Sequence, residues 1–179
     1  MSSKILVLPG DGIGVEVADQ AIRVIEKLNE QGLNASYEKD LVGGASYDVN
    51  GEPLTNSVLE KAKNSDAVLL GAVGGSKWDD VERSKRPEAG LLGLRKELEL
   101  FANLRPALVF DALVSASTLK NEVVNNLDIM IVRELTGGVY FGQPRGIEDT
   151  PNGKKAIDTQ IYYDYEIDRI ARVAFDLAR

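Results

Sequence analysis

Two residue types with frequent catalytic roles are missing from this sequence. Its 179 residues include no cysteine and no histidine. A disulfide, a thiolate nucleophile, a cysteine-bound metal and an imidazole ligand are therefore excluded for this chain. Any general acid or base must be an aspartate, glutamate, lysine or tyrosine side chain.

The sequence also has no long apolar run and no excess of positive charge. No stretch approaches the roughly 20 apolar residues of a membrane span, and the N-terminal apolar run is too short for a signal peptide. The formal net charge of −7 argues against a general nucleic-acid surface. We therefore expect a cytoplasmic protein that binds neither membranes nor nucleic acid, although local arginines could still bind a small anion.

The apolar runs of the first half predict an α/β fold. Short runs at 4–8, 35–42 and 67–71 are typical of strands, and the first is expected to be buried on both faces. Helical patterns separate them, the second one capped by Thr55 or Asn56, and a glycine turn and loop are expected between 43 and 51. This alternation predicts a largely parallel sheet.

The second half predicts mixed structure and a second domain. A helix is expected over 90–98, strands over 101–110 and 129–133, and an amphipathic helix from Asp164. The polar loop 145–154 is expected to join two extended flanks into a hairpin arm near 140–163. We expect domains at 1–100 and 101–179, the first belonging to a cofactor-binding domain and the second to a substrate and dimerisation domain.

Two glycine-rich segments invite a nucleotide interpretation. Gly10-x-Gly12-x-Gly14 lacks the spacing of the dinucleotide fingerprint, because Val15 occupies its last glycine position. The alternative is a tight strand-to-helix turn that needs positive φ. Residues 74–79, Gly-Gly-Ser-Lys-Trp-Asp, follow a predicted strand at its carboxyl end, where ligands bind in open sheets. They suit either a nucleotide or a mobile surface loop anchored by its tryptophan.

Three arginines suggest a site for a small acid. Arg95, Arg105 and Arg133 could converge on a di-carboxylate, or each could form an ordinary ion pair. The neighbouring pair Leu91 and Leu92 favours an acid that carries an apolar branch. Near these residues, Tyr140 is a candidate proton donor or an aromatic residue packed at a hinge.

Taken together, several segments resemble one enzyme family. They are GDGIG, VGGSKWDD, RPEAGLLGLRKELELFANLRPA, VRELTGGVYFGQPRG and RIARVAF. These segments look like those of the isocitrate/isopropylmalate dehydrogenases, and within that family like the 3-isopropylmalate dehydrogenases of leucine biosynthesis. The resemblance implies the two-domain α/β fold of that family, incomplete in this chain.

The resemblance also implies a reaction and a set of roles. The family oxidises the 2-hydroxyl of 3-isopropylmalate with NAD and then releases CO2, using Mg2+ or Mn2+. The three arginines would hold the malate carboxylates, and the leucine pair would face the isopropyl group. Tyr140 would deliver a proton to the enolate, and Glu88 would lie where the substrate side chain meets the nicotinamide. The cofactor-binding residues would be Ile13, Gly75, Ser76, Lys77, Trp78, Asp79 and Glu88.

The chain departs from the family pattern in two ways. Val15 and Ser76 stand where the family usually has proline. The chain is also about half the usual length, and the other half would supply the catalytic lysine and the metal-binding aspartates, so no metal ligand is expected in this chain. The family implies a homodimer with shared active sites. We expect the chain alone to be inactive. The alternatives are a truncated non-catalytic regulatory subunit, or a dehydrogenase for a related 2-hydroxy diacid such as tartrate, malate or isocitrate.

Overall fold

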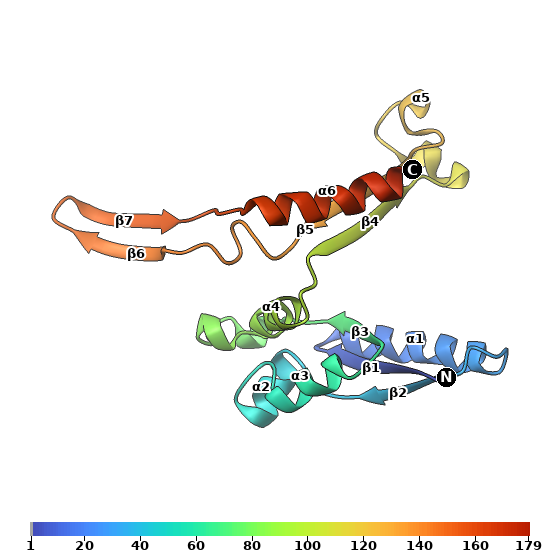
Figure 1. The fold of residues 1–179 in the computed structure, drawn as a ribbon, viewed down its shortest axis with the longest axis horizontal. Helices are drawn as coiled ribbons and strands as arrows, with labels where there is room; N and C mark the ends of the chain where they lie inside the picture. Colours follow the sequence, from blue (N-terminus) through green and yellow to red (C-terminus); the bar gives the residue numbers. More distant parts are fainter. Residues whose placement is uncertain (1) are drawn as a thin grey trace. The chain divides into compact units, whose positions relative to one another are not determined.

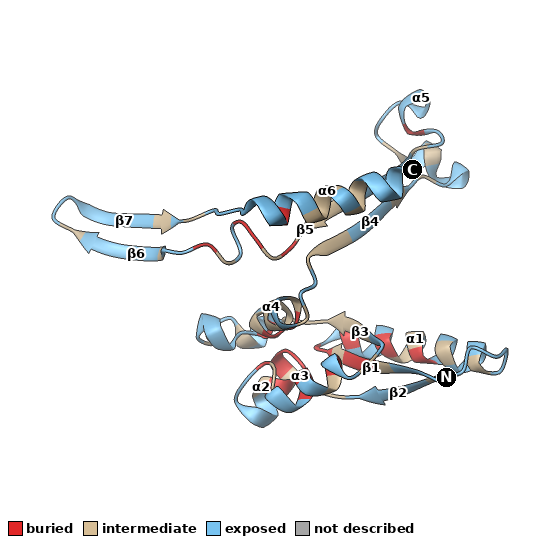
Figure 2. Ribbon diagram, in the orientation of Figure 1, coloured by how far each residue is buried: buried red, intermediate tan, exposed pale blue. Residues whose placement is uncertain are grey.

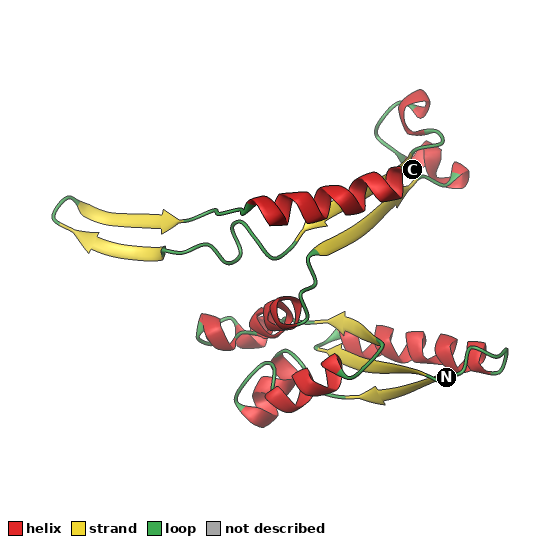
Figure 3. Cartoon of the chain, viewed as in Figure 1, coloured by secondary structure: helices red, strands yellow, loops and turns green. Residues whose placement is uncertain are grey.

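The computed structural model describes residues 2–179, which form two compact units, one up to Leu98 and the other from Glu99 to Arg179. The first unit is a layered α/β structure (Figures 1 and 3). Its sheet is parallel, as the alternating pattern predicted, and has the strand order β2-β1-β3. The elements are β1 (Ser3–Gly10), α1 (Ile13–Asn29), β2 (Ala35–Lys39), α2 (Gly44–Asn50), α3 (Asn56–Lys63), β3 (Ala67–Ala72) and α4 (Pro87–Glu97).

The central strand β1 is buried on both faces, which confirms the prediction for this run (Figure 2). Successive side chains of a strand point to opposite sides, so β1 contributes to two clusters. Leu6 and Leu8 pack with residues of α3 and α4, whereas Val7 packs with Ala18 and Ile22 of α1. The helices therefore cover both faces of the sheet.

The glycines after β1 form the tight turn that was one of the two interpretations of this motif. Gly10 and Gly12 have φ angles of 75° and 51°, in the region that glycine adopts without a steric penalty. A Cβ atom on Gly14 would overlap the backbone of Pro9 and Ala72. The first turn of α1 is thus packed directly against the carboxyl ends of β1 and β3.

The second unit has two antiparallel strand pairs and one long helix. Strand β4 pairs with β5, β6 pairs with β7, and α6 packs on β5. The β6–β7 hairpin extends away from α6 (Figure 1), and Figure 2 shows that few residues of this unit are buried. The elements are β4 (Ala102–Leu108), α5 (Asn121–Val124), β5 (Asp128–Glu134), β6 (Arg145–Thr150), β7 (Gly153–Asp158) and α6 (Asp164–Ala178).

Several local predictions were wrong. A short helix, α2, replaces the turn and loop predicted over 43–51, and β2 ends at Lys39 rather than at residue 42. The hairpin predicted near 140–163 is present, but β6 and the start of β7 lie within the segment 145–154 that was predicted as a polar loop, because charged residues there pair across the two strands. Strand β5 is largely exposed, although its apolar sequence had indicated a buried strand. Helix α6 covers only part of the apolar surface of this strand, and Ile129, Met130 and Ile131 remain exposed.

Candidate active site

Four of the predicted site residues share one face of α4. Glu88, Leu91, Leu92 and Arg95 are spaced at i, i+3, i+4 and i+7, which places them along one stripe of a helix. Glu88 is exposed, and the other three are half-buried. A carboxylate and a guanidinium therefore flank an apolar pair on this face.

The opposite face of α4 anchors the helix in the core. Pro87, Gly90 and Leu94 are buried there, and Leu94 belongs to the cluster around Leu6 and Leu8. A Cβ atom on Gly90 would lie 2.7 Å from the carbonyl oxygen of Pro53, so the helix backbone approaches that loop closely. Proline at the first helical position suits the start of α4, because the amide hydrogen it lacks has no helical partner there. The core contact fixes which face carries the predicted site residues.

The predicted cofactor loop follows β3 and is held by α2. The Trp78 ring lies against Gly44, where no Cβ atom could fit, and its Nε1 donates to Asp48 Oδ1 at 3.1 Å. Lys77 Nζ donates to Asp48 Oδ2 at 2.6 Å. The hydrogen bonds from Lys77 and then from Trp78 lower the pKa of the Asp48 carboxyl. The tryptophan anchor that one interpretation assigned to this loop is present, and Lys77 has an acidic partner.

A buried carboxylate connects this loop to the other turns at the same edge of the sheet. Asp11 accepts hydrogen bonds from the backbone amides of Gly44 at 2.9 Å, Ala45 at 2.7 Å and Gly74 at 2.8 Å. It thereby links the turn after β1, the start of α2 and the segment after β3. Sequence reasoning gave Asp11 no role, although its position between two glycines of a strand-to-helix turn was a signal. Ile13, the first residue of α1, is exposed beside this turn.

Glu88 also reaches this edge. A Cβ atom on Gly74 would lie 2.9 Å from Glu88 Oε1, so the carboxylate covers that glycine. Arg86 donates to the carbonyl oxygens of Val81 at 2.9 Å and Asp79 at 2.5 Å. The first unit therefore brings the start of α4 close to the loop after β3, at one edge of the sheet.

In the second unit, one face of the β4–β5 pair carries two of the arginines. Arg105 is opposite Ile131, and Asn103 is opposite Arg133, so the two arginines are diagonal neighbours on the same face. Arg105 Nε donates to Asn103 Oδ1 at 2.6 Å. Arg133 donates to the Tyr140 hydroxyl, and its Cζ lies 5.4 Å from the centre of the Tyr140 ring. Sequence reasoning missed Asn103, whose alternation with Arg105 was the available signal.

The predicted residues thus form groups within each unit. Arg95 belongs to the first unit, and Arg105 and Arg133 to the second, so convergence of the three arginines stays a prediction. Over residues 2–179, the acidic side chains form no group of three or more that could hold a metal ion. This part of the chain therefore does not provide the ligands that a divalent metal ion needs.

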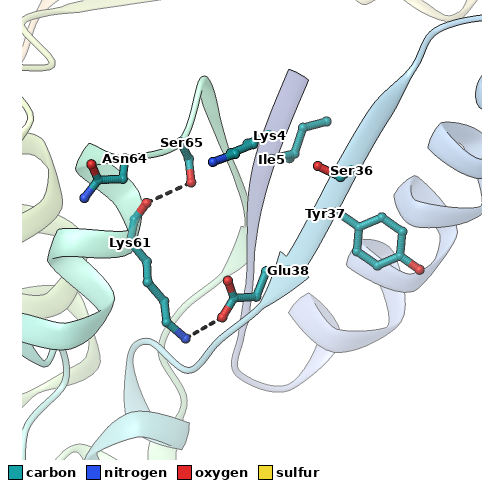
Figure 4. Close-up of a pocket in the computed structure, with 8 residues that line it drawn as sticks. All are labelled: Lys4, Ile5, Ser36, Tyr37, Glu38, Lys61, Asn64 and Ser65. Carbon is teal, nitrogen blue, oxygen red and sulfur yellow. Dashed lines mark hydrogen bonds and ion pairs between the residues drawn. The ribbon is translucent and has the colours of Figure 1, made fainter. Parts of the chain in front are cut away.

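A separate surface pocket of about 340 Å3 contains none of the predicted site residues (Figure 4). It lies beside β1, β2 and α3, and the ion pair between Lys61 Nζ and Glu38 Oε1, at 2.5 Å, lies at its wall. Lys61 also pairs with Asp40 at 2.7 Å. The hydrogen bonds that Lys61 donates to Asp40 and then to Glu38 raise its pKa, so Lys61 stays charged and paired with these two carboxylates.

Comparison with known proteins decides the family. The model of the isocitrate/isopropylmalate dehydrogenase family matches residues 4–179. The chain belongs to this family. The finding confirms the family predicted from the sequence, and with it the α/β fold class.

Two curated members of the family show how much of it the chain covers. A 3-isopropylmalate dehydrogenase of Chromohalobacter salexigens is 61% identical over 180 residues, covering 100% of this chain and 50% of that protein. One of Rhodopseudomonas palustris is 62% identical over 178 residues, covering 98% of this chain and 48% of that protein. The chain therefore spans about half the length of these relatives.

Solved structures agree on the fold. An isocitrate dehydrogenase from Methylococcus capsulatus superposes with a TM-score of 0.71 at 29% identity, over 99% of this chain and 48% of that one. A β-decarboxylating dehydrogenase from Thermococcus kodakarensis, in its apo form, superposes with a TM-score of 0.67 at 32% identity, over 97% of this chain and 45% of that one.

Among the described residues, no helix combines the length and apolar character needed to cross a membrane.

Proposed function

We propose that this chain provides the substrate-recognition residues and part of the cofactor site of a 3-isopropylmalate dehydrogenase. The reaction would oxidise the 2-hydroxyl of (2R,3S)-3-isopropylmalate with NAD and release CO2 to give 4-methyl-2-oxopentanoate, in leucine biosynthesis. The face of α4 is the observation that carries this proposal. There, Leu91 and Leu92 lie between Glu88 and Arg95, which suits an acid with an apolar branch.

The apolar pair would provide specificity. Burial of a branched alkyl group contributes about 25 cal/mol per Å2, whereas a carboxylate buried there would lack a partner. A third carboxylate, as in isocitrate, would therefore be disfavoured beside Leu91 and Leu92. The 3-isopropylmalate dehydrogenases at 61% and 62% identity support this choice over the isocitrate alternative.

The β4–β5 face would bind carboxylate and place the proton donor. Guanidinium groups bind carboxylates through charge-assisted hydrogen bonds of about 1.5–3 kcal/mol each. Arg105 and Arg133 present such groups on one face. Because Arg133 is the donor toward the Tyr140 hydroxyl, the phenolic proton remains available. Tyr140 would deliver it to the enolate carbon after CO2 leaves.

The loop after β3 fits the expected cofactor. NAD, when bound, accepts the hydride. Gly75 and Ser76 are exposed and leave the backbone open to a ligand, while Trp78 is fixed on α2. Ile13, Lys77, Asp79 and Glu88 complete the proposed cofactor residues. The described part of the chain offers no metal donor set, so the steps assigned here involve no metal ligand. Homodimerisation with shared sites and a cytoplasmic location belong to the same proposal.

NADH formation tests the proposal. The native protein that carries this sequence, given NAD and Mg2+, should form NADH with 3-isopropylmalate and much less with malate, tartrate or isocitrate. Replacement of Arg105 or Arg133 by lysine should raise the KM for 3-isopropylmalate by about 10- to 100-fold, with the KM for NAD unchanged. Arg172→Lys, on an exposed turn of α6, is the matched control. Preference for another diacid, or binding without turnover, would contradict the assignment.

A further inference from the structure

We propose that Glu134 and Arg169 are positioning residues that hold the turn after β5, and through it place Tyr140 on Arg133. The inference rests on the proposed function, because it concerns how the proposed proton donor is placed. It adds two residues, one on β5 and one on α6, to those already assigned to the proposed site.

The Glu134 side chain binds backbone amides of the turn. Its carboxylate accepts from the amides of Thr136 at 2.9 Å and Gly137 at 2.7 Å, and from Thr136 Oγ1 at 2.8 Å. The side chain is only 10% exposed. Desolvation raises the pKa of this carboxyl, but the hydrogen bonds from the turn and from Arg169 outweigh it and lower the pKa below its usual value. A carboxylate with this many donors fixes the conformation of the turn.

Arg169 connects the same turn to α6. Its guanidinium donates to Glu134 Oε1 at 3.2 Å and also to Thr136 Oγ1. It lies 4.6 Å from the Phe101 ring centre and 5.3 Å from that of Tyr165, both within cation–π range. Arg169 Nε is buried and makes no hydrogen bond within the described residues. The planar group is thus confined between rings and a carboxylate, an arrangement that a lysine would not reproduce.

The turn has little room to move. A Cβ atom on Gly137 would lie 2.7 Å from Glu166 Oε2, and one on Gly138 would overlap the Tyr162 ring. Glu166 is itself buried and accepts from the amide of Tyr163 at 2.9 Å. The start of α6 therefore closes over the turn from one side while Glu134 holds it from the other.

The turn held by Glu134 and Arg169 immediately precedes Tyr140, the proposed proton donor. Arg133 and Glu134 are neighbours on β5, so their side chains point to opposite faces. Arg133 contacts the Tyr140 hydroxyl on one face, and Glu134 holds the turn on the other. Tyr140 follows Gly138 by two residues, so displacement of the turn would displace the phenol from Arg133.

The position of Tyr140 can be measured without any enzyme assay. The protein, labelled at the tyrosine Cζ atoms, should give a Tyr140 resonance that Tyr140→Phe removes. Glu134→Gln, Arg169→Met and the milder Thr136→Val should each shift that resonance. Arg172→Met, one turn further along α6 and paired, within the described residues, with exposed Asp168, should leave it in place. An unshifted Tyr140 resonance in folded Thr136→Val and Glu134→Gln would overturn the inference.

Kinetics of the same variants test the coupling. Arg169→Met should lower kcat by about 10- to 100-fold, the loss expected for a displacement near 1 Å, with the KM for NAD within about twofold of the parent. Arg169→Lys should recover little of it. In a double-mutant cycle, Glu134→Gln should add almost nothing to Tyr140→Phe, because both act through one phenol. Additive losses would overturn the inference. An inactive native protein carrying this sequence would instead refute the proposed function, and the resonance would still decide the placement of Tyr140.

Discussion

Nearby residues of β5, and of α4, lie on different faces of their element and make different contacts. Arg133 contacts Tyr140 on one side of β5, and Glu134 holds the following turn on the other. On α4, Leu91 lies on the proposed substrate face, whereas Leu94 lies in the core. The effect of a substitution should therefore depend on the face it alters.

Leu91→Ser should change substrate preference more than stability. The half-buried side chain lies outside the core, so its loss should lower kcat/KM for 3-isopropylmalate by about 10- to 200-fold relative to malate. A substrate panel on the native protein would measure this ratio. Leu100→Ser, at an exposed leucine beyond the helix, is the control. An unchanged ratio would show that the isopropyl group does not contact α4.

Glu134→Gln should remove part of the pH dependence of stability. The folded-state pKa of Glu134 lies below its ordinary 4.5, so its ionised form stabilises the fold above that pH, and the contribution disappears as the pH falls through the lower, folded value. The parent should be more stable than the variant at neutral pH, and the difference should shrink in acid. Urea midpoints at several pH values would measure it. A constant difference would contradict the linkage.

Residue types alone identified the proposed ligand-facing groups but not their supports. Arginines, a leucine pair and a tyrosine carry chemistry that can be recognised from the sequence. Asp11, Asp48 and Glu134 act through backbone amides or side chains whose proximity arises only after folding. An aspartate or glutamate in a polar stretch gives no sign of which distant N–H groups it will accept from.

Among the secondary-structure elements, α4 packs into the core with one face and carries proposed site residues on the other. Its two interior glycines differ in what surrounds them. Gly90 faces the Pro53 backbone, whereas Gly93 faces only the flexible end of Leu54. The helix thus offers a matched pair for testing how closely its position is fixed.

Gly90→Ala should destabilise the first unit by about 1–3 kcal/mol, because the added methyl group would displace α4 from the Pro53 loop. Gly93→Ala should stay within about 1 kcal/mol of the parent, since the better helix propensity of alanine offsets a small shift of Leu54. Denaturant unfolding would compare them. Equal effects of the two substitutions would contradict the close backbone approach at Gly90.

The β6–β7 hairpin should be the least protected pair of strands. Both strands are almost entirely exposed, and an isolated two-stranded hairpin is marginally stable in water. In hydrogen exchange on this chain, the amides of β6 and β7 should exchange far faster than those of buried β1. Equal protection would mean that another surface covers the hairpin. The strands β1 and β3 were predictable because their apolar runs are continuous. The hairpin itself was also predicted, but β6 was not, because its charged residues are typical of a polar loop.

On the scale of the whole molecule, the chain forms two units and spans about half the length of its relatives. The units divide after Leu98, and their assignment to cofactor and substrate roles stays a prediction. Several large apolar side chains of the second unit are exposed, among them Phe110, Ile131 and Phe175. Such surface favours association with further protein.

The 179-residue chain by itself should form no NADH from 3-isopropylmalate, NAD and Mg2+. Its described residues offer no donor set for the metal, and the resemblance implies that the catalytic lysine is not among the residues of this chain. The measurement is NADH absorbance with a preparation whose intact mass has been verified. Turnover by that preparation would contradict the expectation. Mixing it with a full-length relative would test the regulatory alternative, which requires a complex that changes the affinity of the partner.

The alternation along β5 limits the kinds of sequence change that this strand can absorb. A point substitution alters one side and leaves the other intact. Insertion or deletion of one residue within the strand would exchange the sides for every position beyond it. Arg133 would then face α6, and Glu134 would face the proposed substrate. The strand can therefore vary by substitution, whereas a change of length by one residue would lose substrate binding and the support of the turn together.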